Sequence, residues 1–144
     1  MGIVNVTPDS FYDGGRYESP DAARERVGRL LAEGADILDI GGESSNPGAP
    51  RISAEQQIER LRIALGCATE QGALISVDTA SPAVAEFALQ HGASIVNDVT
   101  CLADPELASV VARHDATLIV SHARAHQSEM VGFSEWPEDA YADV

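Results

Sequence analysis

Hydrophobic and polar positions along the chain form five short apolar runs, separated by longer segments in which apolar residues recur every three or four positions. Short, nearly continuous apolar runs are typical of buried parallel strands. The strands we expect lie at 2–6, 36–40, 74–77, 94–96 and 117–120. The longer segments have the periodicity of amphipathic helices, and the helices we expect lie at 20–33, 53–72, 81–92 and 104–114.

Residues at the ends of the expected helices support these boundaries. Ser53 and Gln56 have the spacing of a capping box, in which each side chain bonds the other residue's backbone N–H. Two further helices begin with a serine followed by proline, at 19–20 and 81–82, a common helix start. Glycines, which often end helices, follow three of the segments: Gly34, Gly72 and Gly92.

Regular alternation of strand and helix predicts βα units around a parallel sheet. Polar residues gather after each expected strand, at the sheet edge where such folds bind ligands. No GxGxxG motif follows the first strand, so a dinucleotide-binding fold is disfavoured. We therefore predict an α/β fold of the TIM (β/α)8 barrel family with about five βα units, an incomplete barrel. Residues 1–144 would form one partial domain: a fragment, a piece of a split barrel, or a half-barrel that needs a partner.

Composition narrows the classes of partner. Nine basic residues, all arginine, stand against 23 acidic ones, which gives a net charge of −14. This charge repels nucleic-acid backbones and anionic membranes, so we expect neither as a partner. Two isolated cysteines and the lack of a long apolar run or signal peptide favour a cytoplasmic location. A lysine-free, acidic chain fits either a salt-adapted organism or a GC-rich genome.

The first fifteen residues, MGIVNVTPDSFYDGG, join the first expected strand to a polar, aromatic loop. Asn5 interrupts the apolar run, and Asp9, Phe11 and Asp13 follow among turn-forming residues. An amide at a strand end, followed by a loop with carboxylates and aromatic rings, fits a ligand-facing edge. A buried amide beside an ordinary surface loop is the alternative, and the local residues leave both open.

Four motifs occur in the order, and near the spacing, found in dihydropteroate synthases. They are MGIVNVTPDSFYDGG at 1–15, GADILDIGGESSNPGA at 34–49, ISVDT at 75–79 and VNDVT at 96–100. The chain resembles this family from its first residue to about His122. The resemblance implies a transferase of folate biosynthesis that condenses hydroxymethyl-dihydropterin pyrophosphate with 4-aminobenzoate, making dihydropteroate and releasing pyrophosphate.

The resemblance also implies which residues hold the pterin. Asp78 and Asn97 match the family's pterin-binding positions, and Val99 is a third candidate for pterin binding. A carboxylate and a carboxamide on neighbouring strands can pair with the donors and acceptors of an aminopyrimidine edge. Asp78 can also stabilise positive charge on the pterin methylene as pyrophosphate leaves. The alternatives are a helix cap for Asp78, for which Ser81 is better placed, and a satisfied buried amide for Asn97.

The same resemblance assigns roles at the first strand and its loop. Asn5 matches the residue that helps to bind Mg²⁺ and pyrophosphate, and an amide oxygen suits this hard cation. Asp9, Phe11 and Asp13 match the loop that closes over the site and forms part of the aminobenzoate pocket, where it would exclude water from the reaction. Both aspartates are candidates for catalysis, and solvated turn chemistry is the alternative.

A second loop matches the family with one departure. Its candidates for pyrophosphate and aminobenzoate binding are Ser45, Asn46, Pro47 and Gly48. Family members usually carry arginine where this chain has Asn46, so a charge-assisted contact to pyrophosphate is lost. The nearby Arg51 has no equivalent role in the family.

Further departures concern the fifth strand and the later motifs. Residues 121–123 read Ser-His-Ala where the family shows Met-His-Met, and we interpret His122 and His126 as loop histidines rather than a metal pair. A second pterin-binding aspartate, a lysine and a terminal Arg-His pair are absent from these residues. A non-catalytic or degenerate pterin-binding paralogue is therefore the first alternative, and a pterin-dependent methyl-transfer protein the second. We expect little turnover from these residues alone, and either a homodimer at full length or a partner supplying the missing strands.

Overall fold

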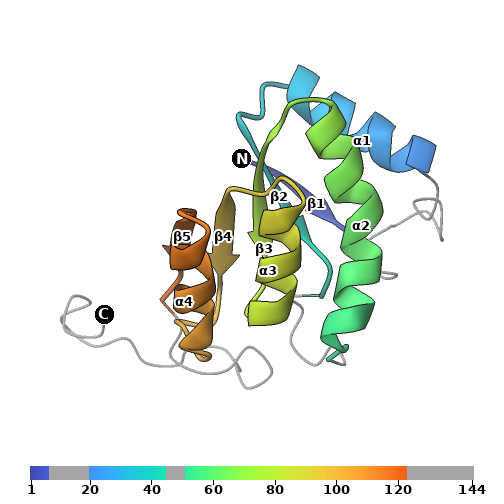
Figure 1. Cartoon of the computed structure of the whole chain (residues 1–144). Coiled ribbons are helices and arrows are strands. Elements are labelled where there is room, and N and C mark those ends of the chain that lie inside the picture. Colours follow the sequence, from blue (N-terminus) through green and yellow to red (C-terminus); the bar gives the residue numbers. More distant parts are fainter. Residues whose placement is uncertain (7–19, 45–50, 123–144) are drawn as a thin grey trace, which may run out of the picture.

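Five parallel strands form one sheet in the computed structural model, which describes residues 1–6, 20–44 and 51–122 (Figure 1). The strands lie in the order in which they occur along the chain. They are β1 (Gly2–Asn5), β2 (Ile37–Gly41), β3 (Leu74–Asp78), β4 (Ile95–Asp98) and β5 (Thr117–Val120). Sequential order distinguishes this sheet from a doubly wound one, in which the order reverses at a switch point.

Four helices connect the strands and pack side by side, α1 on α2, α2 on α3 and α3 on α4. They are α1 (Pro20–Ala32), α2 (Ala54–Glu70), α3 (Pro82–Gln90) and α4 (Glu106–Arg113). Each strand is added beside the previous one on the same side of the growing sheet. Because such βαβ crossovers are right-handed, all the connecting helices lie on one face of the sheet. This is the arrangement of consecutive βα units in a barrel, so the prediction of an incomplete barrel is confirmed.

The core lies between this sheet and the helices. Strand register aligns one apolar residue from each strand in a row across the sheet: Val4, Ile40, Val77, Val96 and Leu118. The first four are at most 5% exposed and belong to one core cluster with helix residues such as Leu61 and Leu107. Leu118 is partly buried and packs against this cluster. Because side chains alternate along a strand, the residues before and after this row point to the face that the helices do not cover.

The expected helix caps are found at the start of α2 but not at the start of α3, and Ser19 lies outside the described residues. Ser53 and Gln56 form the expected capping box at the start of α2. Ser81 occupies the N-cap of α3 but makes no side-chain capping bond. Instead, the Thr79 hydroxyl accepts the Ser81 backbone N–H at 3.1 Å, so the expectation that Ser81 caps this helix through its own side chain is wrong.

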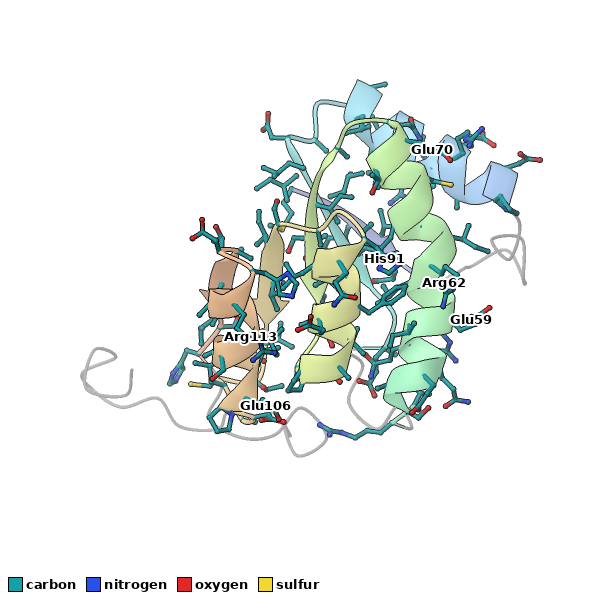
Figure 2. The ribbon with its side chains drawn as sticks, in the orientation of Figure 1. Glu59, Arg62, Glu70, His91, Glu106 and Arg113 are labelled. Atoms are coloured by element: carbon teal, nitrogen blue, oxygen red, sulfur yellow. The ribbon has the colours of Figure 1, made fainter. Side chains whose placement is uncertain are left out.

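Charged side chains cover the outer surface of the helices (Figure 2). On α2, Glu59, Arg62 and Glu70 are all more than half exposed, and Glu70 pairs with Arg24 of α1. No helix in the described part of the chain is long and apolar enough to cross a membrane.

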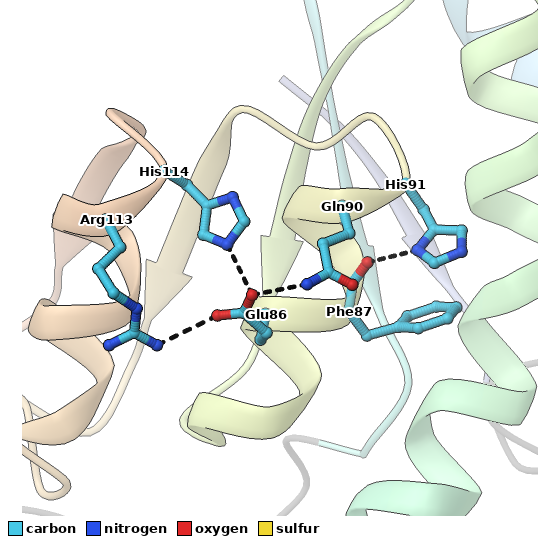
Figure 3. Close-up of polar contacts among 6 residues, drawn as sticks. All are labelled: Glu86, Phe87, Gln90, His91, Arg113 and His114. Carbon is cyan, nitrogen blue, oxygen red and sulfur yellow. Dashed lines mark hydrogen bonds and ion pairs between the residues drawn. The ribbon is translucent and has the colours of Figure 1, made fainter.

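An ionic cluster joins α3 to α4 around Glu86 (Figure 3). Its carboxylate accepts hydrogen bonds from Gln90 at 2.7 Å and His114 at 2.9 Å, and pairs with Arg113 at 3.2 Å. The hydrogen bond from His114 is the main cause that lowers the pKa of Glu86 below its ordinary 4.5.

Replacing Glu86 by Gln is expected to lower the thermal unfolding midpoint by a few degrees at neutral pH. Since the folded-state pKa is lowered, the charge stabilises the fold above pH 4.5 and this contribution is lost as the pH falls through the folded-state pKa. The difference between the two proteins should also shrink in 1 M salt, because exposed ion pairs are screened. Thermal melts at two pH values and two salt concentrations measure this; a difference independent of both would contradict it.

Candidate functional site

Three polar residues and one glycine, from four neighbouring strands, line up at the carboxyl end of the sheet. Register pairs Asn5 with Gly41, Gly41 with Asp78, and Asp78 with Asn97. Alternation places this row on the face without helices. The three predicted ligand-facing residues therefore come together at one edge of the sheet, the edge toward which the β4 arrow points in Figure 1. Asp78 and Asn97 lie within β3 and β4, whereas the sequence placed both just after their strands.

Gly41 lies between two of these side chains, which approach it closely because it has no side chain of its own. A Cβ atom at this position would lie 3.2 Å from Asn5 Oδ1 and 3.4 Å from Asp78 Oδ2. Both oxygens therefore approach the same point above the glycine. A side chain at this position would contact both oxygens, so glycine keeps the surface between the amide and the carboxylate uncovered.

A second polar row lies one layer deeper on the same face. Asp39 and Ser76 are register partners and are 7% and 0% exposed. Asp39 Oδ2 accepts a hydrogen bond from Asn97 Nδ2 at 3.1 Å, which fixes the orientation of the Asn97 amide. Among the described residues, Asp39 Oδ1 and Ser76 Oγ are the buried side-chain polar atoms without a hydrogen-bond partner. Buried oxygens of this kind call for a water or a ligand donor.

Sequence reasoning missed Asp39. The apolar pattern predicts only that Asp39 belongs to the second strand, although a carboxylate inside a buried apolar run is itself a signal for a special environment. Asp39 matters because its bond to the Asn97 side-chain amide determines which polar atoms of that amide face the open side of the sheet.

The charge of the site is strongly negative. Burial, and after it the nearby carboxylates of Asp39, Asp98 and Glu43, together raise the pKa of Asp78 from 3.8 to about 6. Asp78 is therefore largely ionised at pH 7.5 but protonated in mildly acidic solution. Such an environment favours a ligand that donates hydrogen bonds or gains positive charge, and it repels a bare anion.

Asp98 serves the backbone rather than the open face. It is fully buried, and its carboxylate accepts hydrogen bonds from Thr100 N at 3.0 Å, Thr100 Oγ1 at 2.6 Å and Leu102 N. The turn it holds contains Cys101 and Leu102 at φ of 58° and 55°, a backbone conformation that side chains disfavour. Asp98 thus stabilises the strained connection from β4 to α4.

Replacing Asp98 by Ala is expected to destabilise the fold by roughly 2–4 kcal/mol, because three hydrogen bonds to one buried carboxylate are lost together. Chemical denaturation measures this change. As a control, Asp104→Ala removes a single bond, from Glu106 N at 3.0 Å at the exposed start of α4, and should cost about 1 kcal/mol or less. Equal effects of the two substitutions would contradict the role of Asp98.

Two of the remaining candidates are within the described residues. Val99 is partly buried directly after β4, and His122 is exposed after β5. The candidates outside the described residues are Asp9, Phe11, Asp13, Ser45, Asn46, Pro47, Gly48 and His126. Within the described ranges, no group of three or more His, Cys, Asp or Glu side chains could hold a metal ion.

Known proteins are similar to this chain in sequence. The family model for pterin binding enzymes matches residues 1–144. Dihydropteroate synthase of Bacillus subtilis is 43% identical over 130 residues, which cover 89% of this chain and 46% of that protein.

Solved structures of dihydropteroate synthases are similar to this chain in fold. Yersinia pestis dihydropteroate synthase, determined with a sulfonamide drug complex, superimposes with a TM-score of 0.85 at 33% identity, covering 99% of this chain and 52% of that one. The Thermus thermophilus enzyme in complex with 4-aminobenzoate gives a TM-score of 0.70 at 40% identity, covering 85% and 42%. The chain thus spans about half the length of these relatives, and with a family model matched along its whole length it belongs to the pterin binding enzyme family.

Proposed function

We propose that this chain forms the pterin-binding half of a dihydropteroate synthase. The observation that carries the proposal is the single row of Asn5, Gly41, Asp78 and Asn97 at the carboxyl end of the sheet. The similarity to synthases that act in folate biosynthesis supports it. The substrates we propose are hydroxymethyl-dihydropterin pyrophosphate and 4-aminobenzoate, the second of which is bound in the Thermus relative.

Asp78 and Asn97 would bind the pterin ring. An ionised Asp78 accepts hydrogen bonds from the amino and ring N–H groups of an aminopyrimidine. Asn97, oriented by its bond to Asp39, offers both an acceptor and a donor to the same ring. The negative surroundings that raise the pKa of Asp78 also stabilise the positive charge that develops on the pterin methylene.

In the reaction, the bond from the methylene carbon to the pyrophosphate oxygen breaks, and its electron pair leaves with pyrophosphate. The amine nitrogen of 4-aminobenzoate forms the new bond to that carbon and then loses a proton. The first and second loops would exclude water from this step through Asp9, Phe11, Asp13, Ser45, Asn46 and Pro47.

The donor set suits Mg²⁺ bound together with pyrophosphate. Asn5 Oδ1 is the kind of oxygen ligand that Mg²⁺ prefers, and the acidic site would repel pyrophosphate that arrived without a cation. When bound, Mg²⁺ would supply positive charge that stabilises the leaving group. Asn5 would be its ligand from the described residues, with phosphate oxygens and water completing the coordination.

We also propose a cytoplasmic location and completion of the barrel by further strands, from the same polypeptide, from a second copy in a homodimer or from a partner. β1 and β5 are edge strands in the described sheet. Unpaired edges of a parallel sheet favour association with more strands.

Titration of the native gene product with 7,8-dihydropterin pyrophosphate, with and without Mg²⁺, followed by 4-aminobenzoate, tests the proposal. We expect Mg²⁺-dependent binding and then release of pyrophosphate. For the 144 residues alone we expect binding with little turnover. Failure of the native gene product to bind the pterin would overturn the proposal.

A non-catalytic pterin-binding protein is the second candidate. It is favoured by Asn46, which stands where relatives of this family usually have an arginine. Tight pterin binding without pyrophosphate release by the native gene product would establish this alternative. Binding of a methylated pterin in preference to the pyrophosphate would instead favour a methyl-transfer protein.

A further inference from the structure

Gln57 is a polar side chain buried beneath the rim of the site. It lies in the first turns of α2 and is only 6% exposed. Both ends of its amide are used: Nε2 donates to Glu43 Oε2 at 3.2 Å, and Oε1 accepts from Thr79 Oγ1 at 3.4 Å. Burying an amide costs free energy unless both its ends are hydrogen-bonded. This buried position therefore requires a side chain that can both donate and accept a hydrogen bond.

The two partners of Gln57 follow neighbouring strands. Glu43 comes two residues after β2 ends at Gly41, and Thr79 comes directly after Asp78. Thr79 is itself tied to the next strand, because its backbone N–H donates to the Asn97 carbonyl at 3.1 Å. One amide therefore links the backbone that carries Gly41 to the backbone that carries Asp78.

The start of α2 is docked tightly against the end of β2, which holds Gln57 in place. A Cβ at Gly42 would lie 3.1 Å from the Gln57 carbonyl oxygen and 3.2 Å from Leu61 Cγ. Arg60 also donates to the Gly42 carbonyl at 3.1 Å. The hydrogen-bonded link from Glu43 through Gln57 to Thr79, called the bridge below, is therefore anchored to a closely packed part of α2. This anchoring resists movement of the ends of β2 and β3.

We propose that Gln57 is a positioning residue for the pterin site, acting through Glu43 and Thr79 to set the spacing of the ends of β2 and β3. This spacing defines the gap above Gly41 in which Asn5 and Asp78 converge. The inference rests on the proposed pterin-binding function, which it deepens. Gln57 itself does not touch the ligand, so its effect is on affinity rather than on the chemical step.

Gln57→Met and Thr79→Val, made in the native gene product, test this bridge. Both keep side-chain volume. Gln57→Met removes both hydrogen bonds of the link, and Thr79→Val removes the bond to Gln57 together with the one that its hydroxyl accepts from Ser81 N. We expect each to raise the Kd for 7,8-dihydropterin pyrophosphate about tenfold, because small displacements of binding groups are costly, while kcat at saturating substrate stays unchanged. The double variant should bind no more weakly than the weaker single variant, since both remove the same link.

Two control variants separate positioning from general stability. Gln90→Met is the same substitution on the exposed surface of α3, where it removes one bond to Glu86, and it should leave the Kd unchanged. Thr79→Ser keeps the hydroxyl and should retain wild-type affinity even if its melting temperature falls. Affinity would then follow the hydroxyl group rather than the stability of the fold.

The outcomes distinguish this inference from the proposed function. If the wild-type protein binds the pterin and Gln57→Met binds it equally well, the positioning role is overturned while the function stands. Equal losses in Gln57→Met and Gln90→Met, or additive losses in the double variant, would also overturn it. If the wild-type protein binds no pterin, both proposals fail together.

Discussion

Asp78→Asn is expected to weaken pterin binding by about 100- to 1,000-fold and, at the same time, to stabilise the folded protein at pH 8. The loss of affinity follows from the loss of two charge-assisted hydrogen bonds to the pterin, which together contribute roughly 3–4 kcal/mol. An asparagine keeps the shape of the side chain but presents a donor where the ligand also presents one.

The gain in stability follows from the electrostatics of the site. Burial and the carboxylates of Asp39, Asp98 and Glu43 raise the pKa of Asp78 from 3.8 to about 6. The folded state therefore binds this proton more readily than the unfolded state, so the wild-type protein loses stability as the pH rises from 3.8 through 6. Above that range the charge costs the folded protein roughly 1–3 kcal/mol, and the asparagine variant does not carry this cost.

Two measurements check this prediction. Urea denaturation of both proteins between pH 4 and pH 8 should show the variant gaining stability relative to wild type as the pH rises. Isothermal titration should show wild-type affinity falling below pH 6, and weak, pH-independent binding by the variant. A variant that is less stable than wild type at pH 8, or that retains tight binding, would contradict the role given to Asp78.

Gly41→Val is expected to abolish pterin binding, and Gly41→Ala to weaken it at least tenfold. A Cβ at this position lies 3.2 Å from Asn5 Oδ1 and 3.4 Å from Asp78 Oδ2, so any side chain occupies the point on which the two oxygens converge. The contacts to the protein are tight but bearable for a methyl group, and we expect Gly41→Ala to change stability by no more than about 1 kcal/mol.

Gly66→Ala is the matched control. Gly66 lies in the interior of α2, and a Cβ there has no atom within 4 Å. This substitution should stabilise the protein by about 0.5–1 kcal/mol, since alanine favours a helix, and leave binding unchanged. Normal binding by Gly41→Val would show that the gap between Asn5 and Asp78 is not where the ligand sits.

The fold was largely predictable because two periodicities alternate along the chain. All five strands and four helices lie where the apolar pattern placed them, with shifts of at most two residues at their ends. Those shifts have a physical cause: polar residues such as Asp78 and Asn97 were expected to end their strands. They remain in the sheet because their backbones pair with neighbouring strands while their side chains face the side without helices.

The site was predictable only in part. Motifs identified Asn5, Asp78 and Asn97, but they could not tell that Asp98 turns to the opposite side and holds the following turn. Asp39 and Gln57 were missed because their roles depend on which side chains register and helix docking bring beside them. The apolar run around Asp39 signals a special environment, but the local sequence does not identify the tertiary partners of either residue.

Chemical-shift mapping of the native gene product with 7,8-dihydropterin pyrophosphate tests the central claim most directly. The account predicts that the backbone amides of Gly41 and Asp78 and the side-chain amides of Asn5 and Asn97 shift together along one binding isotherm. Shifts confined to the groove between α2 and α3, around Phe87 and His91, with none in this row, would contradict it.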